Sequence, residues 1–345
     1  MRAAILPAFG EPLRIEDVDA PTPAADEVLL EVEVCGVCHS DLHIIDGDTP
    51  GFRAAAKPRL VPGHEVVGRV IAKGDAAQHL AIGDRVGVAW LHSACGVCEL
   101  CREGNENLCR KGVVTGLMVD GGYAQAMRAK ASHALPIPDG LSSLQAAPLF
   151  CAGVTVYRAL KNAGAGPGQR VGIFGVGGLG HLAVQIAKAW GAEVIAFDLG
   201  EDKLALAREL GASEAIDVTR PDVVKAARQR GGLHIAVVTS AAKAAYDVAL
   251  KCLRPTGTLA VVGLPPEPLS FPALALVGGE LRIVSAAVGT RDDIRAVLAL
   301  AAAGQLTCRV EEAPLAEVNA VLTRMRRGAI RGRMVLRCCG AVGAG

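Results

Sequence analysis

A glycine-rich turn between an apolar strand and a helix constrains the fold of this chain more than any other feature. The turn, Gly175-Val-Gly-Gly-Leu-Gly180, directly follows the apolar run Val171–Phe174 and opens a helical stretch that extends from Leu179 to Trp190. The next apolar run, from Glu193 to Phe197, ends in Asp198. Strand, glycine turn, helix and strand in this order predict a right-handed βαβ unit, and therefore a parallel sheet with helices on its faces.

The pattern of the chain on either side of this unit predicts two kinds of domain. A helical stretch from about Glu201 to Leu210 and apolar runs at 235–238, 258–262 and 281–286 continue the alternation, which indicates a doubly wound parallel sheet of the Rossmann type. Short β-type runs at 28–34, 66–71 and 85–88, separated by Gly, Pro and Asp, favour a barrel-like β domain before it. A length of 345 residues suits two such domains.

The glycine turn also carries a chemical prediction. Gly175 permits the tight turn, Gly177 lets the backbone approach a pyrophosphate, and Gly180 allows close packing of helix on strand. Gly178 and Leu179 belong to the same turn, where the helix N-terminus offers N–H groups and a positive dipole to phosphates. Asp198, at the end of the second strand, is suited to accept hydrogen bonds from the adenosine ribose hydroxyls and would repel a 2′-phosphate. The sequence therefore predicts NAD rather than NADP.

Four cysteines lie within fifteen residues, and this spacing predicts a metal site. An odd total of eleven cysteines without a secretion signal argues against a disulfide framework and for thiolate ligands. Four thiolates close a tetrahedral shell around Zn²⁺ and leave no open position, so this zinc would be structural. An iron–sulfur cluster is the competing metal, and buried or redox-active thiols are the simpler alternative. The four residues are Cys95, Cys98, Cys101 and Cys109.

Three further residues stand in contexts that suit an open metal site: Cys38, His64 and Cys151. Two thiolates and an imidazole with a fourth position for water or substrate form a known catalytic zinc arrangement. Each residue is a weak signal alone, because a single His is more often structural and a buried Cys is more often a small hydrophobic side chain. Cys35 and Cys38 could also form a redox pair, although they do not open a helix in a thioredoxin-like unit.

Charge and hydropathy exclude several partners. The formal net charge is +1 with no Lys/Arg block, so neither a nucleic acid nor an anionic membrane is an expected partner. The apolar runs are interrupted before the roughly 18 residues that a membrane span needs. The first residues lack the long apolar core of a secretion signal. We therefore expect a soluble cytoplasmic protein.

The whole chain resembles the zinc-containing alcohol dehydrogenases of the medium-chain dehydrogenase/reductase superfamily, particularly their bacterial, tetrameric, NAD-dependent branch. The matching stretches cover nearly all of the chain and include both metal signatures. They are Cys35–His43, Pro62–Glu65, Gly83–Val86, Ser93–Cys109, Asp120–Tyr123, Phe150–Thr155, the glycine turn and Val288–Thr290.

The resemblance implies a GroES-like β-barrel catalytic domain, formed by residues 1–153 and 290–345, and a Rossmann NAD-binding domain at 154–289. A structural zinc lobe would occupy about 93–112. The resemblance makes Cys38, His64 and Cys151 the catalytic zinc ligands. It implies that Ser40 and His43 form a proton relay, that Asp41 orients the ligand histidine, and that Glu65 is the carboxylate behind the metal.

The resemblance also implies cofactor contacts outside the glycine turn. Lys203 would touch the adenosine ribose, Arg333 would reach the pyrophosphate, and Gly263, Leu264 and Val288 would border the nicotinamide. The remaining expected cofactor contacts are His39, Thr155 and Thr239.

The expected substrate pocket departs from the family pattern. Relatives carry Trp where this chain has Thr49, and the segment 51–56 is about three residues longer than theirs. The loss of an indole would widen the pocket, unless Phe52 folds back and fills it. Trp90 and Leu91 still match pocket-lining positions.

We expect reversible hydride transfer between NAD and a primary or secondary alcohol, with aldehyde or ketone as product. Zinc would act as a Lewis acid, and Ser40 and His43 would relay the proton. One alternative is a related zinc reductase for aromatic, furan or polyol substrates. Another, of a different class, is a non-catalytic zinc- and NAD-binding structural protein. A homo-oligomer, a tetramer by resemblance, would pair through edge strands near Leu281–Ala286.

Overall fold

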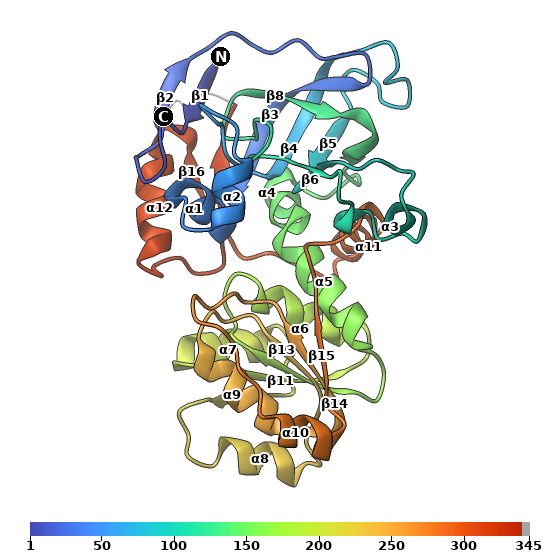
Figure 1. The fold of residues 1–345 in the computed structure, drawn as a ribbon, viewed down its shortest axis with the longest axis vertical. Helices are drawn as coiled ribbons and strands as arrows, with labels where there is room; N and C mark the ends of the chain where they lie inside the picture. Colours follow the sequence, from blue (N-terminus) through green and yellow to red (C-terminus); the bar gives the residue numbers. More distant parts are fainter. Residues whose placement is uncertain (340–345) are drawn as a thin grey trace. The chain divides into compact units, whose positions relative to one another are not determined.

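The structure is a computed structural model that describes residues 1–339, and it divides into two compact units (Figure 1). The first unit comprises Met1–Cys151, Thr290–Ala302 and the chain from Cys308 onward. The second comprises Ala152–Gly289 and Ala303–Thr307. The chain therefore leaves the first unit after Cys151, builds the second, and returns at Thr290.

An antiparallel sheet organises the first unit. Its strand order is β16-β17-β3-β4-β5-β9, with β8 also paired to β3, and every pair except β16–β17 is antiparallel. Val, Leu and Ala side chains from these strands form a continuous core. The strands are β3 (Glu27–Val37), β4 (Glu65–Lys73), β5 (Arg85–Val88), β8 (Ala126–Lys130), β9 (Ala134–Pro136), β16 (Val310–Pro314) and β17 (Arg333–Arg337).

Shorter elements surround this sheet. Two hairpin-like pairs, β1 (Arg2–Ile5) with β2 (Arg14–Asp17) and β6 (Leu91–Ser93) with β7 (Val113–Val114), are separate two-stranded sheets. The helices of the unit are α1 (His39–Asp46), α2 (Pro50–Ala55), α3 (Glu99–Arg102), α4 (Ser143–Ala146), α11 (Arg291–Ala302) and α12 (Val318–Arg326). Four 3₁₀ turns complete it: η1 (Glu106–Leu108), η2 (Ala131–His133), η3 (Ala147–Phe150) and η4 (Leu315–Glu317).

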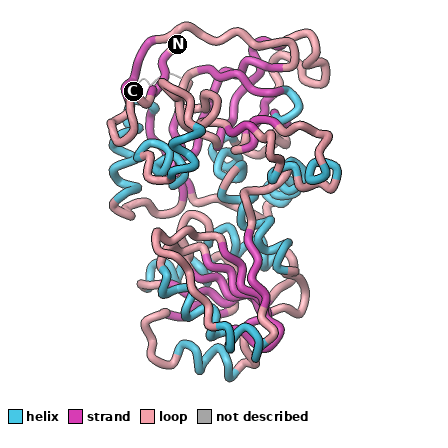
Figure 2. Tube along the Cα trace, in the orientation of Figure 1, coloured by secondary structure: helices cyan, strands magenta, loops and turns pink. Residues whose placement is uncertain are grey.

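The second unit is built on a parallel sheet with the order β12-β11-β10-β13-β14-β15. The strands form a central layer with helices around it (Figure 2). The strands are β10 (Arg170–Phe174), β11 (Glu193–Asp198), β12 (Glu214–Asp217), β13 (Leu233–Val238), β14 (Leu253–Val261) and β15 (Arg282–Ser285). The helices are α5 (Ala152–Ala163), α6 (Gly180–Ala189), α7 (Glu201–Glu209), α8 (Val223–Gln229), α9 (Lys243–Cys252) and α10 (Ala273–Gly279).

The expected α/β architecture is confirmed, and the order of the sheet follows from the chain direction. Sequence order reverses at β10, which has β11 on one side and β13 on the other, as in a doubly wound sheet. Phe174 and Phe197 are register partners on β10 and β11, and their rings stack with centroids 4.3 Å apart. The periodicity did not predict β12, because its four residues carry two acids and give no apolar run.

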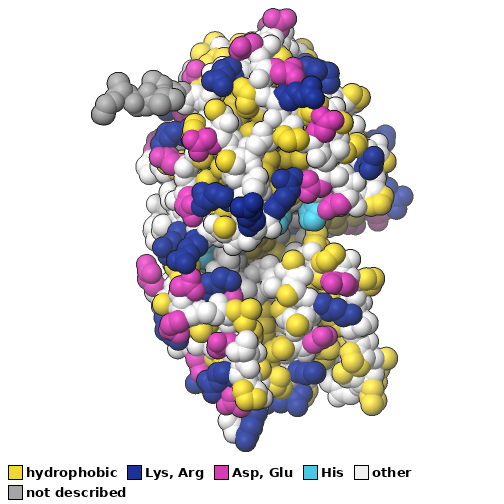
Figure 3. Space-filling model, turned by 90° about the vertical axis from the view of Figure 1, so that its left-hand side faces the viewer, with side chains coloured by type: hydrophobic (Ala, Val, Ile, Leu, Met, Phe, Trp, Pro, Cys, Tyr) yellow, Lys and Arg dark blue, Asp and Glu magenta, His cyan; other side chains and the backbone are white. Residues whose placement is uncertain are grey.

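The surface agrees with the balanced charge of the sequence. On the face drawn in Figure 3, acidic and basic side chains are interspersed. Within residues 1–339, no helix combines the length and apolarity that crossing a membrane requires.

Candidate active site

Two thiols and one imidazole from separate parts of the first unit converge at one buried point. Cys38 immediately precedes α1, His64 immediately precedes β4, and Cys151 follows η3. Their ligand atoms and one oxygen of Glu65 all lie within 4.8 Å of one another. The structure therefore brings together the three residues that the resemblance selected, and Glu65 with them.

A buried carboxylate fixes the tautomer of the imidazole. His64 Nδ1 lies 3.0 Å from Asp41 Oδ1, and the other Asp41 oxygen accepts hydrogen bonds from the Cys38 N–H (2.9 Å) and the Tyr123 hydroxyl (2.8 Å). Because a carboxylate accepts, Nδ1 carries the proton and Nε2 presents a lone pair. Nε2 of His64 is buried and has no hydrogen-bond partner within the described residues. A metal ion is the partner that this geometry fits.

The spacing of the sulfurs also fits zinc. A tetrahedral ion with Zn–S bonds of about 2.3 Å places two sulfurs about 3.8 Å apart. The Sγ atoms of Cys38 and Cys151 are 3.8 Å apart. Cys35, the other member of the possible redox pair, instead hydrogen-bonds through its thiol to the carbonyl of Gly36.

The electrostatics of the two thiols agree with a shared ligand set. The hydrogen bond with Cys151 holds the pKa of Cys38 well below its usual value, and the same bond raises the pKa of Cys151. Burial disfavours the charged imidazole, but the Asp41 carboxylate outweighs it and raises the pKa of His64.

Glu65 is balanced by a buried arginine. Arg333 Nη2 donates to Glu65 Oε1 and to the Val37 carbonyl, and both side chains of the ion pair are almost completely buried. Burial raises the pKa of Glu65 to about 7, and the Arg333 charge acts against that rise. The family resemblance implied that Arg333 reaches the pyrophosphate, and this ion pair was not predicted. Its Nε has no partner within residues 1–339, and its cofactor contact stays a prediction.

Ser40 and His43 lie three residues apart on α1, a spacing that places side chains on the same side of a helix. His43 Nδ1 lies 2.9 Å from Asp48 Oδ2, and the His43 side chain is 40% exposed. The histidine is therefore open to solvent and held by a carboxylate, which suits the end of a proton relay.

Aromatic side chains connect the inserted segment to the ligand histidine. The Phe52 ring, on α2, lies 5.6 Å from the Trp90 ring, and Trp90 meets the His64 ring edge-on at 4.9 Å. The Phe52 ring therefore lies against Trp90, one of the residues expected to line the substrate pocket. Thr49 precedes α2 and donates its hydroxyl to Asp48, and Leu91 begins β6.

The cysteine quartet forms a second site in the loop that contains α3 and η1. All four sulfurs lie within 4.8 Å of one another, with Cys95 and Cys101 at 3.9 Å and Cys98 and Cys109 at 4.0 Å. These separations fit a tetrahedral ion with four sulfur ligands. Backbone N–H groups of Cys95 and Cys98 donate to sulfurs of the set, which stabilises thiolates.

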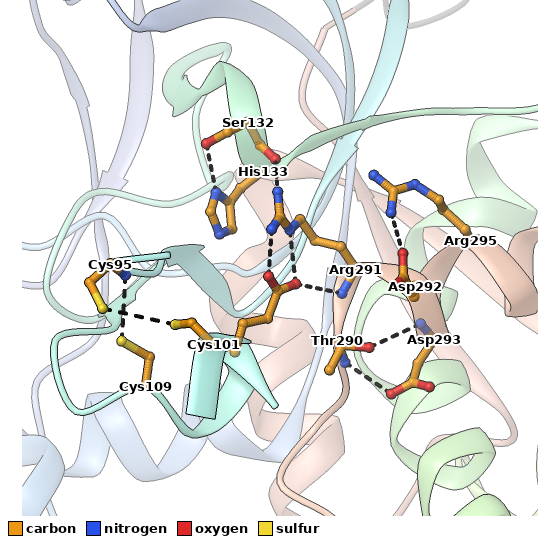
Figure 4. Close-up of polar contacts among 11 residues, drawn as sticks. Cys95, Cys101, Cys109, Ser132, His133, Thr290, Arg291, Asp292, Asp293 and Arg295 are labelled. Carbon is orange, nitrogen blue, oxygen red and sulfur yellow. Dashed lines mark hydrogen bonds and ion pairs between the residues drawn. The ribbon is translucent and has the colours of Figure 1, made fainter. Parts of the chain in front are cut away.

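An arginine outside the lobe fixes the lobe to the rest of the first unit, and no sequence pattern predicted this contact. Arg291, at the start of α11, donates to both Glu106 oxygens through Nε (2.8 Å) and Nη2 (2.5 Å), and through Nη1 to the Ser132 carbonyl. Figure 4 shows Arg291 between the cysteines and Ser132. Its backbone N–H also donates to Glu106. The contact joins residues 185 positions apart, so no local pattern could reveal it.

The glycine turn of the second unit has the shape that a pyrophosphate requires. Gly175 has φ +97°, and a Cβ at Gly180 would collide with the Gly175 carbonyl oxygen. A Cβ at Gly177 would instead point into open space, which is where the phosphates would lie. Thr239 Oγ1 donates to the Gly175 carbonyl at 2.7 Å and supports the turn from the neighbouring strand β13.

Asp198 lies at the end of β11, beside this turn. It accepts hydrogen bonds from the backbone of Val176 and Leu199, and Lys203 Nζ lies 3.1 Å from its Oδ1. The carboxylate that the sequence assigned to ribose is thus held in place by the turn itself.

The other expected cofactor residues are distributed over both units. Gly178 and Leu179 are in the turn, and Thr155 is on α5. Gly263 follows β14 with its carbonyl bonded to the Tyr246 hydroxyl, Leu264 is 72% exposed, and Val288 has φ +54°. His39 opens α1 in the first unit.

The comparisons with known proteins agree with this geometry. Family models match at residues 24–139, described as an alcohol dehydrogenase GroES-like domain, and at 178–303, described as a zinc-binding dehydrogenase. An alcohol dehydrogenase of Geobacillus stearothermophilus is 46% identical over 98% of this chain and 99% of its own length. Another, from Moraxella sp. (strain TAE123), is 43% identical over 97% and 99%.

Solved structures also show similarity to alcohol dehydrogenases and related reductases. The alcohol dehydrogenase of the hyperthermophilic archaeon Aeropyrum pernix superposes with a TM-score of 0.88 at 36% identity, over 98% of this chain and all of the other. Acetophenone reductase from Geotrichum candidum, solved in complex with NAD, superposes with a TM-score of 0.87 at 33% identity, over 97% and 96%. These relatives decide against the non-catalytic alternative. The chain belongs to the zinc-dependent alcohol dehydrogenases of the medium-chain dehydrogenase/reductase superfamily.

Proposed function

We propose that the chain oxidises alcohols with NAD at a zinc ion held by Cys38, His64 and Cys151. The observation that carries this proposal is the convergence of two sulfurs 3.8 Å apart on a buried imidazole nitrogen that lacks a partner. Four-sulfur sites are closed, whereas this set has only three nitrogen and sulfur donors, so substrate oxygen has a position to occupy. When bound, zinc supplies a Lewis acid that makes an alcohol hydroxyl more acidic.

The surrounding residues keep the site close to electrical neutrality. Two thiolates match the charge of one zinc ion, and the Arg333 guanidinium matches Glu65. Asp41 holds His64 in the tautomer that offers Nε2, and this support raises the basicity of the ligand. One carboxylate oxygen of Glu65 lies in the same ligand set, and the ion pair of Glu65 Oε1 with Arg333 restrains the side chain there.

We assign removal of the alcohol proton to Ser40 and His43 on α1. Ser40 would accept the alcohol proton through its hydroxyl, and His43 would pass it to water, because an exposed imidazole can both take up and release a proton. Asp48 holds the His43 ring through Nδ1. NAD supplies the hydride acceptor when it is bound. Asp198 and the glycine turn would hold its adenosine and pyrophosphate, and the carboxylate favours NAD over NADP.

The division into domains is part of this proposal. We assign catalysis to residues 1–153 and 290–345, including the cysteine lobe at about 93–112, and NAD binding to 154–289. The two compact units support the boundaries near Cys151 and Thr290, which differ from these limits by two residues or fewer, although Ala303–Thr307 belongs to the second unit. The lobe would hold a second, structural zinc.

Substrate preference within the family is open to experiment. Relatives include a cinnamyl alcohol dehydrogenase of Sorghum bicolor as well as the acetophenone reductase. The Phe52–Trp90 contact supports a pocket narrowed by the inserted segment, which favours small primary and secondary alcohols over bulky aromatic ones.

We also propose that the chain forms a homo-oligomer through α10 and β15, and by resemblance a tetramer. Strand β15 is the last strand of its sheet and leaves one edge unpaired in the described chain. Leu274 and Val277 on α10 are 84% and 76% exposed, and Ile283 on β15 is 40% exposed. An open strand edge beside exposed apolar side chains fits a second copy of the same chain.

Metal analysis of a cysteine variant tests the catalytic site. We expect about two zinc ions per chain in the native protein and about one in Cys38→Ser, because the closed four-sulfur site keeps its ion. The variant should lose alcohol oxidation while it binds NAD with native affinity, measured by fluorescence titration.

The matched control is Cys35→Ala, which removes a buried thiol of the same segment that is outside the ligand set. This variant should retain both zinc ions and native turnover of alcohol. Native turnover in a Cys38→Ser protein verified to lack one zinc would refute the assignment. Loss of turnover in Cys35→Ala with both zinc ions present would favour the redox-pair interpretation.

A further inference from the structure

A cavity of about 300 Å³ opens in the second unit, away from the glycine turn. It is lined by the end of α5, by Gln169 just before β10, and by the first residues of β13, β14 and β15. The glycine turn and Thr239 follow the carboxyl ends of β10 and β13. The cavity therefore lies at the opposite, amino edge of the sheet, and the proposed reaction gives it no role.

The charged side chains that line this cavity are all basic. Lys161, Arg254 and Arg282 contribute cations, and no Asp or Glu is among the lining residues. Within residues 1–339, neither Arg254 nor Arg282 has an ion pair with an acid. Other cations of the unit do have such pairs, which are Lys203–Asp198, Arg208–Glu201, Arg220–Asp222 and Arg230–Glu214. The two guanidinium charges of the cavity are therefore not compensated by an acid of the described chain.

A buried hydroxyl in the cavity wall lacks a partner. Thr258 is 1% exposed, and its Oγ1 makes no hydrogen bond within the described residues. Its register partners on the two neighbouring strands are Ile235 and Arg282, which also line the cavity. Paired residues of parallel strands point to the same face of the sheet, so the hydroxyl and the Arg282 side chain leave the sheet on one side. Buried polar groups are rarely left unpaired without a reason.

A histidine adds one more donor. His234 Nδ1 accepts the backbone N–H of Arg170 at 3.0 Å, so the hydrogen of the neutral ring is on Nε2. Burial, with the Arg170 and Arg254 charges, lowers the pKa of His234, which favours the neutral ring. Guanidinium, ammonium, imidazole N–H and hydroxyl groups can all donate, and the side chains offer few acceptors in return. Such a lining selects an anion.

We propose that this cavity binds a small phosphate-bearing anion. Arginine forks match the geometry of phosphate oxygens, and two guanidinium groups suit a divalent phosphate better than a single carboxylate. The volume is at the lower end of ligand cavities, about 300 to 1,000 Å³, so it has room for a phosphate group with a small organic body. The ligand and NAD would bind at the same time, because they occupy opposite edges of one sheet.

Calorimetric titration of the full-length, zinc-loaded protein tests the site. Inorganic phosphate and glycerol 3-phosphate are added separately at constant ionic strength, with NAD at saturation so that the glycine turn is occupied. We expect saturable binding of at least one of the two. Equal affinity would identify the free ion as sufficient, and tighter binding of the ester would show that an organic body fills the cavity.

Three variants locate the binding. Arg254→Gln and Arg282→Gln should each weaken phosphate binding by about tenfold, as expected for loss of a charged hydrogen bond. Thr258→Val should also weaken binding, while the melting temperature of the ligand-free protein stays level or rises because the unpaired hydroxyl is gone. The matched control, Arg220→Gln, lies beyond β12 at the far edge of the sheet and should bind phosphate as the native chain does.

Three results would overturn the proposal. They are the absence of saturable binding of either probe with NAD present, unchanged affinity in both arginine variants, and an equal loss in Arg220→Gln. A fourth result would show that the Thr258 hydroxyl does not belong to the site: a Thr258→Val protein that melts at a lower temperature yet binds phosphate with native affinity. A native melting temperature in the arginine variants guards against misfolding as the cause of lost binding.

Discussion

At the scale of single residues, the chemistry of His64 depends on what its ring contacts on each side. Asp41 accepts from Nδ1, Trp90 covers the ring edge-on, and Nε2 is left for a ligand. Phe52 then packs on Trp90 from the inserted segment. A substitution in α2 can therefore affect, through one aromatic ring, the imidazole that we assign to the metal.

Phe52→Ala should widen the substrate pocket. Loss of the ring removes apolar surface beside Trp90, so catalytic efficiency with benzyl alcohol should rise relative to ethanol by about tenfold, the scale of a pocket contact. Steady-state kcat/KM with both alcohols measures this ratio. Arg53→Ala, on the same helix but stacked on Phe9, is the control and should leave the ratio unchanged. An unchanged ratio in Phe52→Ala would show that this side chain does not line the pocket.

His133 should make the protein less stable in mild acid. Burial, with the Arg291 charge, lowers the pKa of His133 to about 4, below the usual value for an exposed histidine. The unfolded chain therefore binds the proton more readily, so stability is complete above about pH 6.5 and is lost as pH falls towards about 4, by at most about 3 kcal/mol. Its Nε2 is buried without a partner within residues 1–339, so the charged ring gains nothing there.

Urea unfolding at about pH 7.5 and about pH 5 measures this loss against His133→Asn. Asn keeps a polar group for Ser132, which lies 2.9 Å from His133 Nδ1, but cannot take up a proton. The variant should lose less stability between the two pH values than the native chain, whatever its absolute stability. Identical losses would mean that His133 does not titrate differently in the folded protein.

At the scale of elements, the cysteine lobe shows how very short helices can be held in place by side-chain contacts. Helix α3 has four residues and η1 has three, too few to be stable alone. The four sulfurs can close the loop around an ion, and the Glu106–Arg291 pair fixes it to α11. Glu106 is mostly buried, with 12% of its side chain exposed, so this pair is shielded more than a surface ion pair would be.

Glu106→Gln should loosen the lobe. The amide keeps the shape of the side chain but leaves the Arg291 guanidinium without its counter-charge, which costs about 1 to 3 kcal/mol for a hydrogen bond to a charged group. The lobe should then release zinc faster to a chelator, which a colorimetric metal indicator can follow. Glu103→Gln, an exposed acid of the same lobe, is the control and should release zinc at the native rate. Equal rates of zinc release from the native protein and both variants would show that the Glu106–Arg291 pair does not anchor the lobe.

At the scale of the whole molecule, the open edge at β15 should be where copies of the chain meet. Leu274→Asp together with Ile283→Lys places charge on the exposed apolar face of α10 and β15. We expect a smaller assembly than the native protein by light scattering, because buried charges at an interface are costly. Ile82→Lys, a substitution of an exposed isoleucine in the first unit, is the control. A native assembly size in the double variant would place the interface elsewhere.

The sequence alone was sufficient for the features whose signals are local. The strand, glycine turn and helix around Gly175 follow from adjacent residues, and β5 begins and ends where the apolar run predicted. The cysteine quartet is likewise compact in sequence. These features need only neighbouring residues, because backbone conformation and close-spaced ligands are set within one or two turns of chain.

Only the tertiary structure could decide which distant side chains meet. Cys38 and Cys151 are 113 residues apart, and Glu65 and Arg333 are 268 apart. Periodicity gives no information on such pairs, so the metal ligands could be predicted only from the family resemblance. The contacts of Tyr123 and Arg291, and the pairing of Arg333 with Glu65, were not predicted. The cavity at Thr258 is a stronger case, because it exists only where the amino ends of three strands meet the end of a helix. Neighbouring residues determined the strands, the glycine turn and the cysteine quartet. Packing of the folded chain determined which distant side chains meet at the three-ligand site and at the cavity.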